Sequence, residues 1–85
     1  MFHYVYVLLS KKDNKFYTGY SENLKIRLEQ HKSGYNLSTK DRRPLILVYY
    51  EACRSKKDAQ HRERYLKTYY GKQFLYKRIK SYLTG

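Results

Sequence analysis

A short run of β-branched and aromatic residues near the N-terminus most limits what this chain can fold into. Residues 4–9 are Tyr-Val-Tyr-Val-Leu-Leu, a composition typical of a β-strand. A polar turn follows, and residues 16–20, Phe-Tyr-Thr-Gly-Tyr, predict a second strand that completes a hairpin. With a four-residue turn at 11–14, Gly19 should lie opposite Tyr6 and leave room beside it.

The middle of the chain predicts one helix and one further strand. Ser21 is a candidate N-cap for a helix from about Glu22 to Ser33, and Gly34 is placed to end that helix. Residues 45–51 are nearly all apolar. We therefore expect a central strand that is covered on both faces.

The C-terminal part predicts two helices. Ser55 and Asp58 resemble a capping box that opens a helix to about Tyr70, with Gly71 ending it. A last helix is expected over about 73–83, with an apolar stripe formed by Leu75, Ile79, Tyr82 and Leu83. The order strand, strand, helix, strand, helix, helix predicts a single α+β domain over residues 1–85. Its small three-stranded sheet, antiparallel or mixed, would be flanked by helices.

Composition narrows the class of partner. The 85 residues have a formal net charge of +12, which favours a polyanion, with nucleic acid first. A membrane surface is disfavoured because there is no long apolar run, and the N-terminal run is too short and too rich in tyrosine for a signal peptide. The single Cys53 allows no internal disulfide and suits a reducing cytoplasm.

Among the seven carboxylates, Glu63 stands out by its position. In the second predicted helix it shares one face with Ala59, Leu66 and Tyr70. An acid on an apolar stripe loses solvation unless it has a partner. Two interpretations remain open: a salt bridge to one of the many Lys and Arg residues, or a metal ligand lining a cleft.

The first predicted helix places Arg27 and His31 four residues apart, so their side chains can reach one site. A guanidinium suits phosphate oxygens, and an imidazole can move a proton near neutral pH. The alternative is a surface charge beside a satisfied histidine. On the hairpin, Tyr6 and Tyr17 would flank an open patch of backbone, although aromatic core packing would explain most of the tyrosines equally well.

Taken in order, these residues resemble the GIY-YIG nuclease domain over nearly the whole chain. The similarity is greatest to the small stand-alone YhbQ-like (UPF0213) group, and it extends to the N-terminal nuclease half of UvrC. The matching positions are Tyr4-Val5-Tyr6, Tyr17-Thr18-Gly19, Arg27, His31 and Glu63.

The resemblance implies a metal-dependent endonuclease that hydrolyses DNA phosphodiester bonds, with a role in DNA repair or recombination. Glu63 would hold a single Mg²⁺ or Mn²⁺ ion. Tyr17 would be the general base or position the attacking water, and Tyr6 would orient the water or the phosphate. Arg27 would stabilise transition-state charge, and His31 would assist proton transfer or hold Tyr17.

The chain also departs from the family's pattern. Tyr4 stands where the first motif has glycine, Thr18 replaces the usual isoleucine, and the late Asn of several active members has no counterpart. A non-catalytic nucleic-acid-binding module with the same fold is therefore the alternative. The sequence leaves open whether the DNA would be branched, nicked or single-stranded, whether RNA is also cut, and which oligomer forms.

Overall fold

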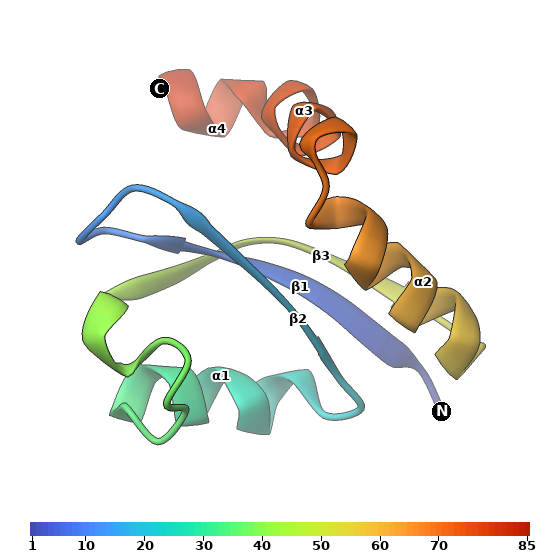
Figure 1. The fold of residues 1–85 in the computed structure, drawn as a ribbon. Coiled ribbons are helices and arrows are strands. Elements are labelled where there is room, and N and C mark those ends of the chain that lie inside the picture. Colours follow the sequence, from blue (N-terminus) through green and yellow to red (C-terminus); the bar gives the residue numbers. More distant parts are fainter.

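The computed structural model describes residues 1–85. It confirms the α+β architecture and the expected order of the first elements, and it adds a short helix at the C-terminus (Figure 1). The elements are β1 (His3–Ser10), β2 (Phe16–Ser21), α1 (Leu24–Ser33), the 3₁₀ turn η1 (Lys40–Arg42), β3 (Leu45–Cys53), α2 (Lys56–Leu66), α3 (Tyr69–Arg78) and α4 (Lys80–Thr84).

The central strand of the sheet is β1, so the prediction of a central strand at 45–51 is wrong. The strand order is β2-β1-β3, and both pairings are antiparallel. β1 is buried from Val5 to Ser10, whereas β3 has no fully buried residue. An apolar run therefore marked β3 as a strand but not as an interior one, because a strand can be apolar and still lie at an edge.

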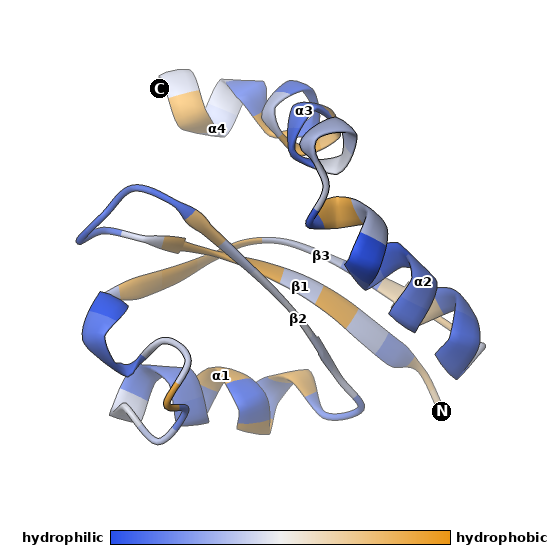
Figure 2. Cartoon of the chain, in the orientation of Figure 1, coloured by the Kyte–Doolittle hydropathy of each residue, from blue (hydrophilic) through white to orange (hydrophobic).

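The two faces of the sheet have different roles. Val5 and Val7 point to the face covered by α2 and α3, where they form the core together with Ala59, Leu66 and Leu75. Because side chains alternate along a strand, Tyr6 points to the opposite face, where its hydroxyl contacts His31 of α1. Hydrophobic residues are concentrated on the strands, while most of α2 is hydrophilic (Figure 2). None of the helices is both long enough and apolar enough to cross a lipid bilayer.

Helix α1 begins two residues later than expected. Asn23, rather than Ser21, is its N-cap, and the Asn23 side chain accepts a hydrogen bond of 3.1 Å from the backbone N–H of Ile26. Ser21 instead ends β2, and its hydroxyl bonds to the backbone of Asn23. Gly34 ends α1 with a φ of 83°, as predicted, because this left-handed conformation favours glycine.

Helix α2 begins as predicted but ends early. Ser55 is its N-cap, and the helix stops at Leu66 rather than near Tyr70. Thr68 then caps α3, with its hydroxyl accepting from the N–H of Gly71 at 3.1 Å. A β-carbon on Gly71 would collide with the backbone of α2. Gly71 therefore allows the close approach of two helices and does not end one.

The last predicted helix, 73–83, is in fact the end of α3 followed by α4. The break lies at Ile79, whose φ of −115° and ψ of 29° are not helical. Leu75 is buried as expected, but Tyr82 is 53% exposed, so the predicted stripe does not form one buried face.

Candidate active site

Tyr6 is the buried centre of the candidate site. Its backbone pairs with Gly19 in β2, as the hairpin predicted, and its ring lies directly over that glycine. The side chain has no exposed surface. The expectation of an open patch of backbone beside Gly19 is therefore wrong, because the phenol ring of Tyr6 itself fills the space that glycine leaves.

His31 joins helix α1 to this phenol. Its Nε2 lies 2.8 Å from the hydroxyl of Tyr6, and its Nδ1 lies 2.6 Å from the hydroxyl of Thr39. The side chain is 1% exposed. Since both ring nitrogens have partners inside the protein, neither faces solvent.

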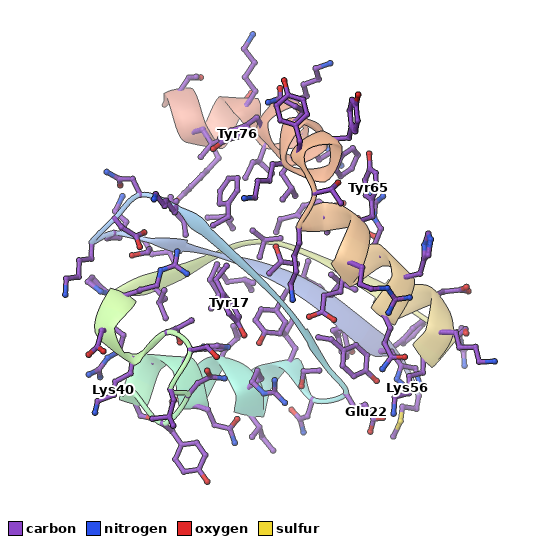
Figure 3. All side chains as sticks on the ribbon, viewed as in Figure 1. Tyr17, Glu22, Lys40, Lys56, Tyr65 and Tyr76 are labelled. Atoms are coloured by element: carbon purple, nitrogen blue, oxygen red, sulfur yellow. The ribbon has the colours of Figure 1, made fainter.

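Tyr17 packs against the same pair from β2. Its ring centroid lies 5.2 Å from that of His31, edge to face, and 6.4 Å from that of Tyr6. Figure 3 shows Tyr17 between the sheet and α1. Tyr17 is only partly buried, whereas Tyr6 has no exposed surface, so Tyr17 is the more accessible of the two tyrosines.

Arg27 lies one turn before His31 on α1 and is partly buried. One guanidinium nitrogen donates to the backbone carbonyl of Tyr20 at 3.2 Å. A guanidinium has five N–H donors, so this anchor leaves others for a ligand. The charge of Arg27 acts on both Tyr6 and His31, as the pKa values of these two groups show.

Glu63 belongs to α2, which lies on the other side of the sheet from α1 (Figure 1). Its side chain is 22% exposed, and its carboxylate accepts from the ammonium of Lys67 at 3.1 Å. The salt bridge considered from the sequence is therefore present. It occupies one oxygen of an accessible carboxylate, and this carboxylate is near enough to raise the pKa of Tyr6.

The electrostatics keep the buried groups neutral. Burial raises the pKa of Tyr6 to about 12, although the neighbouring Arg27 opposes the shift. Burial, and then the charge of Arg27, lower the pKa of His31. At neutral pH a buried phenol and a buried imidazole therefore share one uncharged hydrogen bond, and neither is poised to lose or gain a proton.

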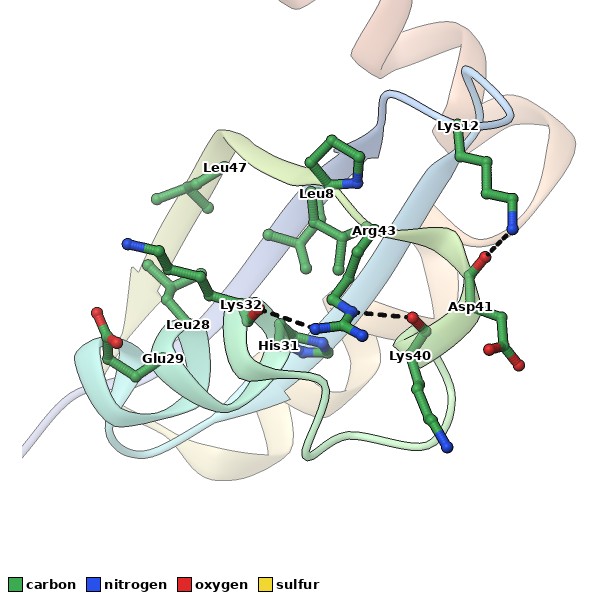
Figure 4. A pocket seen from close by; sticks show the side chains of 12 residues that line it. Leu8, Lys12, Leu28, Glu29, His31, Lys32, Lys40, Asp41, Arg43 and Leu47 are labelled. Carbon is green, nitrogen blue, oxygen red and sulfur yellow. Dashed lines mark hydrogen bonds between the residues drawn. The ribbon is translucent and has the colours of Figure 1, made fainter.

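Two hollows of the surface border these residues, but no single hollow joins them. Arg27 lines a shallow hollow of about 300 Å³ at the start of α1, without Tyr17 or Glu63. A larger one of about 700 Å³ lies between α1 and the start of β3 and has His31 among its lining residues (Figure 4). Neither of these two hollows includes Tyr17 or Glu63, so neither is the cleft that the sequence led us to expect beside Glu63.

Thr39 is the residue of this cluster that the sequence did not indicate. It is fully buried, although it lies in a polar, basic loop that predicts exposure. The loop is held by Arg43, whose guanidinium donates to the carbonyls of Lys40 and Lys32 at 3.0 and 3.4 Å (Figure 4). Lys12 adds a bond of 2.9 Å to the carbonyl of Asp41.

The donor set near Glu63 can be compared with what a metal ion needs. No three His, Cys, Asp or Glu side chains gather to hold an ion. Mg²⁺, however, keeps several waters and often takes only one or two carboxylates plus substrate phosphate. A single accessible carboxylate fits an ion that is shared with a phosphate ligand.

A family model described as the GIY-YIG catalytic domain matches residues 2–80. The chain belongs to the GIY-YIG family. This domain defines a superfamily of nucleases, and the match spans every element from β1 to the end of α3. Membership therefore covers the strands and helices that bring together Tyr6, Tyr17, Arg27, His31 and Glu63.

Relatives of similar length agree with a small stand-alone GIY-YIG protein. The UPF0213 protein SH2523 of Staphylococcus haemolyticus is 45% identical over 74 residues, covering 86% of this chain and 89% of the relative. The UPF0213 protein CPE1444 of Clostridium perfringens is 43% identical, covering 75% and 69%. The solution structure of the UPF0213 protein BH0048 of Bacillus halodurans is similar at a TM-score of 0.56 and 37% identity, covering 88% of this chain and 82% of that one.

Proposed function

We propose that this GIY-YIG protein is an endonuclease that hydrolyses DNA phosphodiester bonds with the help of one Mg²⁺ or Mn²⁺ ion. The observation that supports this most is the environment of Tyr6, because Arg27, Tyr17 and Glu63 each lie close enough to affect the pKa of that phenol. All three are partly accessible, and they surround the buried pair Tyr6 and His31.

Glu63 is the residue proposed to hold the ion. When bound, a divalent ion there would polarise a phosphate oxygen and neutralise charge on the leaving oxygen. Lys67 orients the carboxylate through its 3.1 Å contact. The same lysine adds positive charge beside the place where the phosphate would lie.

Arg27 and Tyr17 are the groups proposed to touch the substrate. The guanidinium would donate to the non-bridging phosphate oxygens, which gain charge as water attacks phosphorus and the bond to the leaving oxygen breaks. Tyr17 would accept a hydrogen bond from the attacking water or take its proton. Tyr17 is the more accessible of the two tyrosines, which is why we assign it, and not Tyr6, to the water.

Tyr6 and His31 are then positioning residues. Both are buried, and their 2.8 Å hydrogen bond ties β1 to α1. This bond fixes the helix face from which Arg27 projects, and the edge of the His31 ring supports Tyr17. Of the two roles considered for His31, holding Tyr17 fits its burial better than proton transfer to a substrate.

Charge supplies the binding in this proposal. A net charge of +12 attracts the nucleic-acid backbone without regard to sequence, so affinity should fall steeply with salt. A role in DNA repair or recombination, in the cytoplasm, would suit a small nuclease whose binding shows no base preference.

The test is cleavage of a panel of DNA structures by Glu63→Gln, with Glu29→Gln as the matched control. Glu29 is an exposed acid on α1, so both variants change the net charge equally. We expect Glu63→Gln to bind DNA like the wild type but to lose divalent-ion-dependent nicking. Glu29→Gln should retain both.

Two results would contradict the proposal. Undiminished nicking by Glu63→Gln would remove Glu63 from the site. Absence of cleavage by the wild type on single-stranded, nicked and branched DNA, with Mg²⁺ and with Mn²⁺, would leave a non-catalytic nucleic-acid-binding module of the same fold.

A further inference from the structure

The C-terminal part of the chain has a charge distribution unlike the rest. No Asp or Glu follows Glu63, while cations continue to the start of the last helix. Only one of them, Lys67, is in a salt bridge, with Glu63 itself. The cations are Arg64, Lys67, Lys72, Lys77, Arg78 and Lys80.

Exposed tyrosines lie among these cations. Tyr69 and Tyr70, at the start of α3, are 70% and 73% exposed, and their ring centroids lie 5.4 Å apart at 82°. Tyr76 is 49% exposed. Large aromatic side chains dominate cores and interfaces, so adjacent exposed rings on a small protein indicate a contact surface.

Helical periodicity places these side chains together. Tyr69 and Tyr76 are seven residues apart and lie on one stripe of α3, and Tyr70 and Lys77 lie on the next stripe. Leu75, on the opposite side of the helix, is fully buried against the core. Tyr69, Tyr70 and Lys77 therefore lie on the outer side of α3. Tyr76 and Lys72 lie on the adjoining side, toward the hairpin, where the ring of Tyr76 packs against that of Phe16 with the centroids 5.3 Å apart.

We propose that these two adjoining sides of α3 bind unpaired nucleotides, with bases stacking on Tyr69, Tyr70 and the exposed part of Tyr76, and phosphates contacting Lys72 and Lys77. Aromatic rings interleaved with cations are the combination that binds single strands, because every base has a face that can stack. The surface begins two residues after Lys67, the partner of Glu63. The inference rests on the proposed nucleic-acid substrate, but it concerns a different surface.

Two other occupants fit less well. A second copy of the chain would bring two acid-free, positively charged surfaces together, which is unfavourable. In a duplex, the faces of the bases are already stacked on each other, so the exposed rings would have nothing to stack on. Charge and aromatic character together favour a single strand.

The test is fluorescence anisotropy of a labelled thymidine oligonucleotide, in EDTA so that no cleavage takes place. We expect Tyr69→Ser/Tyr70→Ser to weaken binding about tenfold or more, since each stacked base contributes roughly 1–3 kcal/mol. Tyr35→Ser is the matched control, because Tyr35 is 76% exposed but lies beyond α1. Its affinity should match that of the wild type.

The proposed phosphate contacts are tested by a second pair of variants, which has its own control. Lys72→Gln/Lys77→Gln should weaken binding and reduce the salt dependence more than Lys56→Gln/Lys57→Gln does, although both pairs remove the same charge. A labelled duplex should lose much less affinity than the single strand in the tyrosine variant. If the surface also accepts RNA, the tyrosine variant should lose affinity for a uridine oligonucleotide as it does for the thymidine one. A loss of affinity confined to the thymidine oligonucleotide would indicate that the surface binds DNA.

Photocrosslinking gives a readout that does not depend on variants folding. An oligonucleotide with 5-iodouracil should crosslink to Tyr69, Tyr70 or Tyr76, as peptide mass spectrometry would show. Crosslinks confined to other residues, no single-strand binding, or equal affinity of the tyrosine variant and Tyr35→Ser would each overturn the inference. A wild-type dimer that the tyrosine variant abolishes would do the same. Cleavage is measured separately, so a failure of the Glu63 test leaves this result unaffected.

Discussion

The hydroxyl of Thr39 lies 2.6 Å from Nδ1 of His31, and both side chains are buried. This contact connects the loop after α1 to the hydrogen bond between His31 and Tyr6. Three buried polar groups therefore form one chain from the loop, through α1, to β1. Each group depends on its neighbour, because a buried donor or acceptor without a partner costs more than a hydrogen bond gains.

Removing the hydroxyl should therefore destabilise the fold. We expect Thr39→Val to lower the free energy of unfolding by about 1–3 kcal/mol, because it leaves the imidazole nitrogen unsatisfied. Thr39→Ser should restore most of the loss, and Ser38→Ala, at an exposed neighbour, should have little effect. Urea unfolding measures all three, and a Thr39→Val protein as stable as the wild type would contradict the assignment.

Stability should depend on pH through His31. Its pKa is lowered in the folded state, so the unfolded chain, with the ordinary value of 6.5, binds more protons between the two values. Stability is then fully present above that value and is lost as pH falls below it. Urea midpoints measured from about pH 7 to about pH 5 should decrease in the wild type and in His61→Gln, and should be flatter in His31→Gln.

At lower pH, the stability of the fold depends on a carboxyl group, that of Asp13. The Arg42 guanidinium, 2.8 Å from Asp13, lowers the pKa of that group to about 2 from its usual 3.8. The stability that the ionised Asp13 contributes is present above the usual pKa, and it is lost only as pH falls toward the lowered pKa. A midpoint that stays constant from neutral pH down to about pH 5 would therefore count against the role given to His31.

The two packed glycines should respond differently to Ala. At Gly71 the new methyl group would meet the backbone of Tyr65 and Leu66, which cannot move away without separating α2 from α3. At Gly19 it would meet the end of the Tyr6 ring, which can shift. We expect a loss of about 3 kcal/mol or more for Gly71→Ala and about 1–3 kcal/mol for Gly19→Ala, measured by urea unfolding.

Arg62 holds β3 to the C-terminal helices. It donates to both carboxylate oxygens of Glu51 at 2.9–3.1 Å, and its guanidinium lies 4.5 Å from the ring centroid of Phe74. Arg62→Ala should cost about 1–2 kcal/mol because it loses both contacts. Arg64→Ala, at an exposed neighbour on the same helix, should change stability by less than about 0.5 kcal/mol. Equal losses of stability in the two variants would show that the contacts of Arg62 with Glu51 and Phe74 do not stabilise the fold.

The elements and the hairpin register were predictable from the sequence, because both are set by residues close together in the chain. Alternation within 4–9 and 16–20, together with a four-residue turn at 11–14, placed Gly19 opposite Tyr6, and Gly34 marked the end of α1. The five candidate residues were gathered by resemblance to a family, and the structure places them around one part of the sheet. Sequence alone assigned them to the site but did not determine which of them water can reach.

Tertiary structure decided the rest, because strand order and burial depend on contacts between distant segments. An apolar run at 45–51 is equally suited to a central strand and an edge strand, and only the pairing of β1 with both neighbours made it an edge. The sequence around Gly71 looks the same whether this glycine ends a helix or lies where two helices pack closely. Thr39 is polar in a polar loop, and only the fold of that loop over α1 buries its hydroxyl against His31.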